Sequence, residues 1–156
     1  MEKMKLQTGK VVAAHRVLSA AKYSKLADED KIKVFKICVA LKPIAKKYEE
    51  DSKDAAEKLK PTEDYDKKLQ QAQEYERVTR DPKGDASDLE MGPSEYNAFI
   101  KEVQNYGKLV ADAMKEESEK EVEVEFEKIS QETFTKLMNS NDWTFADAET
   151  VGEVIL

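Results

Sequence analysis

The sequence predicts a mainly helical α+β fold, a long antiparallel helical hairpin with a two-stranded β-sheet and short C-terminal helices. Three observations lead to this prediction. Apolar residues recur at helical spacing through most of the 156 residues, although 38% of the side chains are charged. One of these stripes keeps a period of 3.5 residues, and residues 3–7 and 122–128 alternate with period two. We expect one domain spanning residues 1–156.

The N-terminal segment reads as a strand followed by a helix. Residues 3–7 place lysines in alternation with apolar side chains. Thr8 is of a type that caps helices, and the apolar stripe after it predicts a helix to about Lys22.

A long helix follows, with Asp28 as its expected N-cap and Lys60 as its expected end. Pro43 should bend this helix without ending it, because the apolar pattern resumes at once. The wide apolar arc predicts a central helix with contacts on more than one side; it comprises Ile32, Val34, Phe35, Ile37, Cys38, Leu41, Ile44, Ala45 and Tyr48.

A helical hairpin is expected next, with residues 80–93 as the exposed loop at its tip. The helix before the loop carries one apolar stripe between Tyr65 and Val78. The helix after it, capped by Ser94, carries a coiled-coil-like seam of Tyr96, Phe99, Val103, Tyr106, Val110, Ala113 and Glu117. This seam favours packing within the hairpin, and a homodimer surface is the alternative.

The second strand is predicted over residues 122–128, where valines and a phenylalanine alternate with glutamates. A lone strand leaves its backbone unpaired, so we expect it to pair with residues 3–7, lysines opposite glutamates. The glutamate face of residues 121–127 is interpreted as a charged surface that discourages edge aggregation. Docking of a basic partner is its other interpretation.

Two short helices should close the chain. Ser130 is the expected cap of the first, and Thr144 with Asp147 forms a capping-box pattern for the second. The apolar end, residues 154–156, is expected to complete the core, with a docking tail as the alternative.

Charge is divided unevenly along the sequence. Residues 1–47 carry 12 basic and 4 acidic side chains, whereas residues 48–156 carry 14 and 29. The simplest explanation is that the two segments pack against each other. The lysine-rich helix over residues 31–47 could instead bind an acidic partner. Nucleic acid is the less favoured partner, because the chain as a whole is acidic, with a net charge of −7.

No residue pattern predicts catalysis, a cofactor or a metal, so no catalytic, cofactor-binding or metal-binding residue is assigned and partner-binding residues stay unknown. The only histidine, His15, is expected at the edge of the core, and the only cysteine, Cys38, as a buried free thiol. The acidic residues of the 80–93 loop do not have the spacing of a calcium loop. No apolar run approaches the ~20 residues of a membrane span, and we expect a cytoplasmic protein.

Three segments resemble small uncharacterised proteins encoded by phages and prophages of gut bacteria: residues 5–10, 28–31 and 41–45. The resemblance covers most of the chain in layout and includes no catalytic motif. It implies a role in virion or tail morphogenesis, or an accessory role directed at the host, and for a phage-encoded protein it implies association with the virion.

From these observations we expect a non-enzymatic protein-interaction or assembly accessory protein that binds a protein partner or itself. The alternative is a nucleic-acid-associated regulator that uses the basic N-terminal third. Neither a membrane nor a small-molecule substrate is expected.

Overall fold

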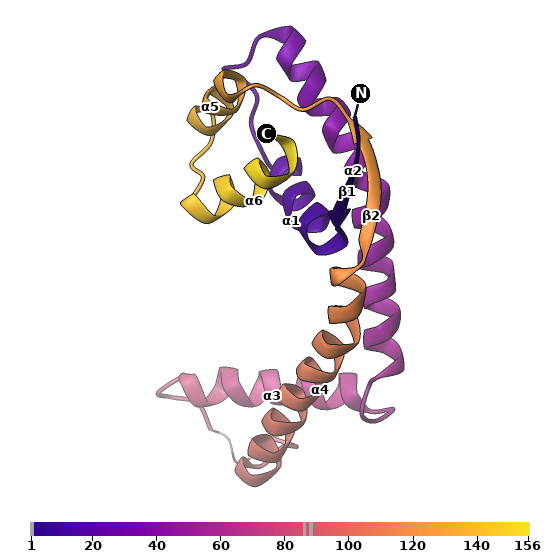
Figure 1. Cartoon of the computed structure of the whole chain (residues 1–156). Coiled ribbons are helices and arrows are strands. Elements are labelled where there is room, and N and C mark those ends of the chain that lie inside the picture. The colour runs from indigo at the N-terminus through magenta and orange to yellow at the C-terminus, as the bar shows by residue number, and fades with distance from the viewer. Residues whose placement is uncertain (1, 86, 88) are drawn as a thin grey trace. The chain divides into compact units, whose positions relative to one another are not determined.

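The computed structural model describes residues 2–85, 87 and 89–156, with only the backbone of Glu2. The chain folds as a mainly helical α+β protein, as predicted (Figure 1). Its elements are β1 (Glu2–Gln7), α1 (Thr8–Ser19), α2 (Asp28–Lys58), α3 (Tyr65–Arg80), α4 (Pro93–Glu119), β2 (Glu121–Phe126), α5 (Gln131–Asn139) and α6 (Phe145–Ile155).

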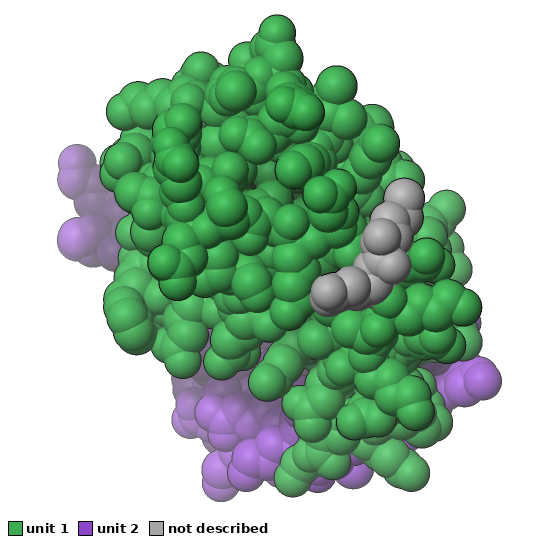
Figure 2. All heavy atoms as spheres, turned by 45° about the horizontal axis from the view of Figure 1, so that its top comes forward, with its two compact units in different colours: residues 1–51, 115–156 green, residues 52–114 purple. Residues whose placement is uncertain are grey.

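The residues group into two compact units, coloured separately in Figure 2. Unit 1 comprises Met1–Asp51 and Lys115–Leu156, and unit 2 comprises Ser52–Met114. Unit 2 is therefore continuous in sequence, while unit 1 is assembled from two distant segments. The expectation of a single domain over residues 1–156 stays a prediction.

The two strands of unit 1 pair antiparallel, as the need for a backbone partner predicts (Figure 1). Met4 lies opposite Val124 and Leu6 opposite Val122 on the apolar face of the sheet. The second strand spans residues 121–126 instead of the expected 122–128. It ends there because the chain turns to α6, where the backbone N–H of Ile129 donates to the carbonyl oxygen of Ile155 at 3.0 Å.

The core of unit 1 is formed by side chains from both of its segments. Its largest fully buried members are Leu18, Ile37, Leu41, Leu137, Ile155, Val11, Val34, Val151 and Val154. Val154 and Ile155 thus complete the core as expected, and Leu156 is 39% exposed. Burial of these apolar side chains is the main stabilising contribution to such a unit.

The prediction that Thr8 caps α1 is wrong. Gln7 occupies the N-cap position, and its side chain makes no capping hydrogen bond. Thr8 is the first residue of the helix, and both its hydroxyl and its backbone N–H donate to the carbonyl oxygen of Lys120, at 2.8 and 2.9 Å. The hydroxyl therefore joins the helix to the chain just before β2.

Helix α1 is also shorter than predicted, because it ends at Ser19 and not at Lys22. The Tyr23 hydroxyl folds back onto the last turn and donates to the Leu18 carbonyl oxygen at 2.8 Å. Asp28 and Ser94 are not N-caps as predicted, because α2 begins at Asp28 and α4 at Pro93, which places both residues inside the first turn. The N-caps of α5 and α6 were predicted correctly. The Ser130 side chain accepts a hydrogen bond from the Thr133 N–H, and Thr144 with Asp147 forms a complete capping box.

Unit 2 contains the helical hairpin of α3 and α4. Tyr75 stacks on Tyr96 near the loop, with ring centroids 4.5 Å apart, and Tyr65 contacts Phe99 and Tyr106 at 5.5 and 5.0 Å. Later residues of α3 thus contact earlier residues of α4, so the two helices run antiparallel, as predicted. The buried centre of the unit is Tyr65, Ala72, Met91 and Phe99.

The predicted seam of α4 holds only where α3 lies beside it. Tyr96, Phe99, Val103 and Tyr106 all belong to the apolar cluster of unit 2. Tyr106 contacts Tyr65, which is the first residue of α3. The later members of the seam, Val110, Ala113 and Glu117, therefore lie beyond the part of α4 that α3 covers. Ala113 is accordingly exposed, and the neighbouring Met114 is buried in its place.

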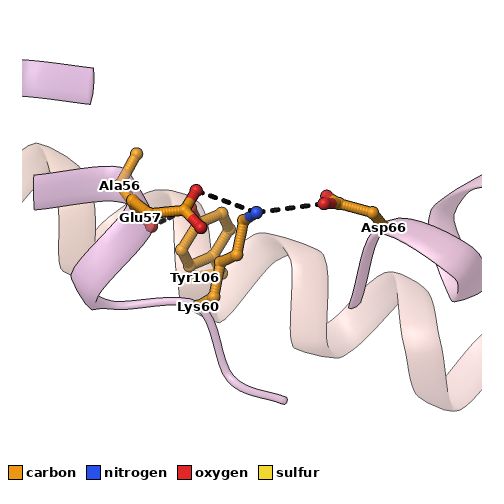
Figure 3. Close-up of polar contacts among 5 residues, drawn as sticks. All are labelled: Ala56, Glu57, Lys60, Asp66 and Tyr106. Carbon is orange, nitrogen blue, oxygen red and sulfur yellow. Dashed lines mark hydrogen bonds and ion pairs between the residues drawn. The ribbon is translucent and has the colours of Figure 1, made fainter. Parts of the chain in front are cut away.

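A polar bridge spans the connection between α2 and α3 (Figure 3). Helix α2 ends at Lys58, two residues before the expected end. The Lys60 ammonium lies 2.9 Å from a carboxylate oxygen of Glu57 and 3.0 Å from one of Asp66, and these two carboxylates raise its pKa. Beside it, the Tyr106 hydroxyl of α4 donates to the Ala56 carbonyl oxygen. Lys60, which lies in the connection, thereby joins Glu57 at the end of α2 to Asp66 at the start of α3.

Candidate interaction surface

Helix α2 carries apolar side chains on two opposite faces. Its first turn contains Asp28, Glu29 and Asp30, and these negative charges interact favourably with the positive N-terminal end of the helix dipole. One face supplies Val34, Ile37, Leu41 and Ala45 to the core of unit 1, each at most 2% exposed. This face has the spacing of 3 and 4 residues that one side of a helix requires.

The opposite face of α2 presents three large apolar side chains to solvent. Ile32 is 55% exposed, Phe35 65% and Val39 53%. Spacings of 3 and 4 residues place them along one line over two helical turns, about 10 Å long. We call Ile32, Phe35 and Val39 the α2 stripe. Isolated exposed apolar residues are ordinary, but a contiguous set on one helix face is typical of a binding surface.

Both ends of the α2 stripe are charged, with opposite signs. On the N-terminal side lies Asp28, whose side chain is 99% exposed and only 3.8 Å from the Lys31 ammonium. On the C-terminal side lie Lys42 and Lys46, both exposed. The spacing of 4, 3, 4, 3 and 4 residues from Asp28 to Lys46 through the α2 stripe keeps all six residues on one helix face.

A hollow of about 160 Å³ borders this face, between α2 and β2. Its lining comprises Lys33, Lys36, Glu125, Phe126 and Glu127. Lys33 is held there by Glu127, with 3.4 Å between the ammonium and a carboxylate oxygen. The lysine-rich helix predicted over residues 31–47 is therefore partly neutralised on this side.

The charge division along the sequence disappears in the fold. Unit 1 contains 16 basic and 19 acidic residues, and unit 2 contains 10 and 14. Basic residues of the N-terminal segment meet acidic residues of the C-terminal segment, for example Lys10 and Glu153 at 3.6 Å. Unit 1 displays packing of residues 1–51 against residues 115–156, which agrees with the simpler of the two explanations for this part of the chain.

The glutamate face of residues 121–127 lies on the outer side of the sheet. Glu123 is exposed opposite Lys5, and Glu125 is exposed opposite Lys3, as the cross-strand pairing predicted. The negative charges of Glu123 and Glu125 are thus partly compensated by the lysines directly opposite. This compensation weakens the attraction of the face for a basic partner.

The lone histidine and the lone cysteine both lie at the edge of the core. His15 on α1 is half-buried, and Cys38 on α2 is a half-buried free thiol. The Tyr23 hydroxyl lies 3.8 Å from the Cys38 sulfur. Burial raises the pKa of the Cys38 thiol, and burial together with Cys38 raises the pKa of Tyr23 to about 12. A thiol with a raised pKa is protonated at neutral pH and is a poor nucleophile.

The acidic loop between α3 and α4 engages its own backbone and a neighbouring amide. Asp81 accepts a hydrogen bond from the Lys83 N–H and Asp85 from the Ser87 N–H, both at 2.9 Å. The Ser87 bonds lower the pKa of Asp85, and Gln71 donates to Glu90 at 2.6 Å. Asp88 lies outside the described residues. Across residues 2–85, 87 and 89–156 no group of three potential metal ligands comes together.

The α2 stripe differs from what the sequence predicts. The wide apolar arc of α2 predicts internal contacts on more than one side, whereas the structure leaves one side of the arc exposed. The signal was present in the regular spacing from Asp28 to Lys46, which is as regular as the seam identified on α4.

Within the described part of the chain, every helix is too short or too polar to cross a membrane.

Comparison with known proteins gives no relative from which a role could be transferred: no family model, no curated protein and no solved structure matches this chain.

Proposed function

We propose that this chain is a non-enzymatic protein-interaction protein and that the α2 stripe is its docking surface. The observation that carries the proposal is the exposure of Ile32, Phe35 and Val39 on one face of a helix whose other face is fully engaged in the core. Covering this face would remove apolar area from water, which favours association. A helix that lays its apolar side against another helix is a common mode of protein recognition.

The resemblance to phage-encoded proteins suggests assembly of a virion or tail as the setting for such an interaction. An assembly factor needs a surface for its partner and no reactive centre. The α2 stripe supplies the first of these requirements.

A nucleic-acid-associated regulator has less support. Lys10, Lys31 and Lys33 lie within 4 Å of carboxylates of the chain itself. Each such carboxylate weakens the attraction of the lysine for a phosphate. Retention on DNA or RNA that falls steeply with salt would be the result that favours this alternative.

The proposed function is tested by capture from a native lysate with the purified chain immobilised. The double variant Phe35→Ser, Val39→Ser should lose the captured protein, because it removes two of the three side chains of the stripe. Leu109→Ser is the matched control: Leu109 on α4 is as exposed as Val39, at 53%, and lies in unit 2. This control should capture as the wild type does, and circular dichroism verifies that both variants are folded. Capture that survives in the double variant contradicts the proposal.

A further inference from the structure

We propose that the α2 stripe pairs with the α2 stripe of a second copy of this chain, with the two helices antiparallel about a two-fold axis. This inference rests on the proposed function and names the partner. The spacing and the charges of six residues on the exposed face of α2 favour this pairing: Asp28, Ile32, Phe35, Val39, Lys42 and Lys46.

The spacing of these residues reads the same in both directions. The intervals are 4, 3, 4, 3 and 4 residues, so reversing the helix superimposes the pattern on itself. Intervals that alternate between 3 and 4 form the seam of a two-helix coiled coil, in which each side chain meets the facing helix at a regular height. A two-fold axis beside position 37 then brings Phe35 against Val39 of the second copy, twice.

The charges complement each other in the antiparallel arrangement. The same axis places Asp28 opposite Lys46 of the second copy, so an acidic end meets a basic end on both sides of the apolar centre. Ile32 lies opposite Lys42, whose four-carbon stem can cover an apolar neighbour while its ammonium reaches water. Opposite charges at both ends favour this register.

A parallel pair would be disfavoured by the same residues. It would place Asp28 against Asp28 and Lys46 against Lys46, and like charges in contact oppose association. The face is therefore complementary to its own reversed copy and not to its parallel copy. Two-fold pairing of this kind is closed, because each copy uses the same patch.

These six residues lie within positions 28–46, a stretch of 19 residues and about 27 Å along the helix, with the apolar contact confined to its middle. An interface of this size belongs to the small, concentration-dependent class. We therefore expect an equilibrium between monomer and dimer, not an obligate dimer.

Sedimentation equilibrium of the purified full chain, over ~10 µM to ~1 mM, tests the inference. Wild type should dimerise, Leu109→Ser should dimerise equally, and the double variant Phe35→Ser, Val39→Ser should be monomeric. Lys46→Asp should weaken dimerisation at least tenfold, because Asp28 would then face an aspartate. Adding Asp28→Lys to Lys46→Asp should restore it, since opposite charges would again meet.

The charge exchange separates the antiparallel pair from a parallel one. In a parallel pair Lys46→Asp would exchange one like-charge contact for another, and the added Asp28→Lys would bring no recovery; that pattern overturns the inference. A wild type that stays monomeric up to ~1 mM also overturns it. If lysate capture still depends on the α2 stripe in that case, the proposed function stands with a different partner, and if capture is independent of the stripe, both fall.

Discussion

The Thr8 hydroxyl donates a hydrogen bond of 2.8 Å to the carbonyl oxygen of Lys120, a residue 112 positions further along the chain. The Thr8 backbone N–H donates to the same oxygen at 2.9 Å, so one carbonyl accepts both bonds. Thr8 is 8% exposed, which shields the contact from water. The pair closes unit 1 at the point where β1 passes into α1 and α4 passes into β2.

Thr8→Val should therefore lower the free energy of unfolding by about 1 kcal/mol, since it removes one hydroxyl bond and keeps the shape of the side chain. Thr8→Ser retains the hydroxyl and should lose less. Urea unfolding of both variants measures the difference, and equal losses in the two would show that the hydroxyl contributes nothing.

Tyr106→Phe should destabilise unit 2 by about 1 kcal/mol, because the hydroxyl that donates to the Ala56 carbonyl oxygen is removed. Tyr75→Phe is the control, because Tyr75 contributes its ring to the stack on Tyr96 and phenylalanine keeps that ring. Hydrogen exchange in peptides from residues 52–114 reports the stability of this unit. Faster exchange should appear in Tyr106→Phe and not in Tyr75→Phe.

Two glycines inside helices should respond differently to alanine. A methyl group at Gly107 in α4 would meet no atom within 4 Å, whereas one at Gly152 in α6 would lie 3.3 Å from the ring of Phe134. Gly107→Ala should raise the free energy of unfolding by about 0.5–1 kcal/mol, the usual gain from replacing a helical glycine. Gly152→Ala should gain less or lose stability, because Phe134 is 8% exposed and has little room to move.

Thermal unfolding of the two alanine variants gives their order. A Gly152→Ala protein more stable than Gly107→Ala would contradict the crowding expected between the added methyl group and the Phe134 ring.

The stabilising effect of Tyr23 should decrease at high pH. Burial, with a smaller contribution from Cys38, raises the pKa of this phenol from 10.0 to about 12. The folded chain therefore keeps a proton that the unfolded chain releases near pH 10, so the free energy of unfolding falls as the pH rises between about 10 and 12. The contribution is fully present below pH 10.

Comparison with Tyr23→Phe isolates this effect from the titration of lysines. At pH 8 the wild type should be the more stable protein, because the Tyr23 hydroxyl donates to the Leu18 carbonyl oxygen. At pH 11 its advantage should be smaller, as measured by urea unfolding. An advantage that grows with pH would mean that folding lowers the pKa of Tyr23, against the shift expected from its burial.

The elements themselves could be predicted from local patterns. The pairing of residues 3–7 with the strand after α4 followed from the requirement that a strand needs a partner, and the caps at Ser130 and Thr144 followed from side-chain chemistry. Thr8 shows the limit of such local reasoning. Its hydroxyl suits a helix cap, yet the carbonyl of a residue far away in sequence offered a better-placed acceptor.

The spacing of the α2 stripe is visible in the sequence, but its exposure to solvent could not be predicted, for a related reason. Hydrophobicity shows that Phe35 and Leu41 are apolar, but it does not show how many elements are available to cover both faces of α2. In unit 1 the core takes one face, and the other is left in solvent. Ala113 illustrates the same point on α4, because the length of α3 decides where the seam stops being buried.

The division of unit 1 into two segments has a consequence for synthesis on the ribosome. β1 is translated first, and its partner β2 follows only after residues 52–114 and the rest of α4 have been made. At 5–20 residues per second, this interval is on the order of ten seconds. Unit 2 can collapse as soon as it emerges, whereas Met4 and Leu6 spend that time without their opposite strand. Met4 and Leu6 therefore stay without their cross-strand neighbours Val124 and Val122 until α4 and β2 have been synthesised.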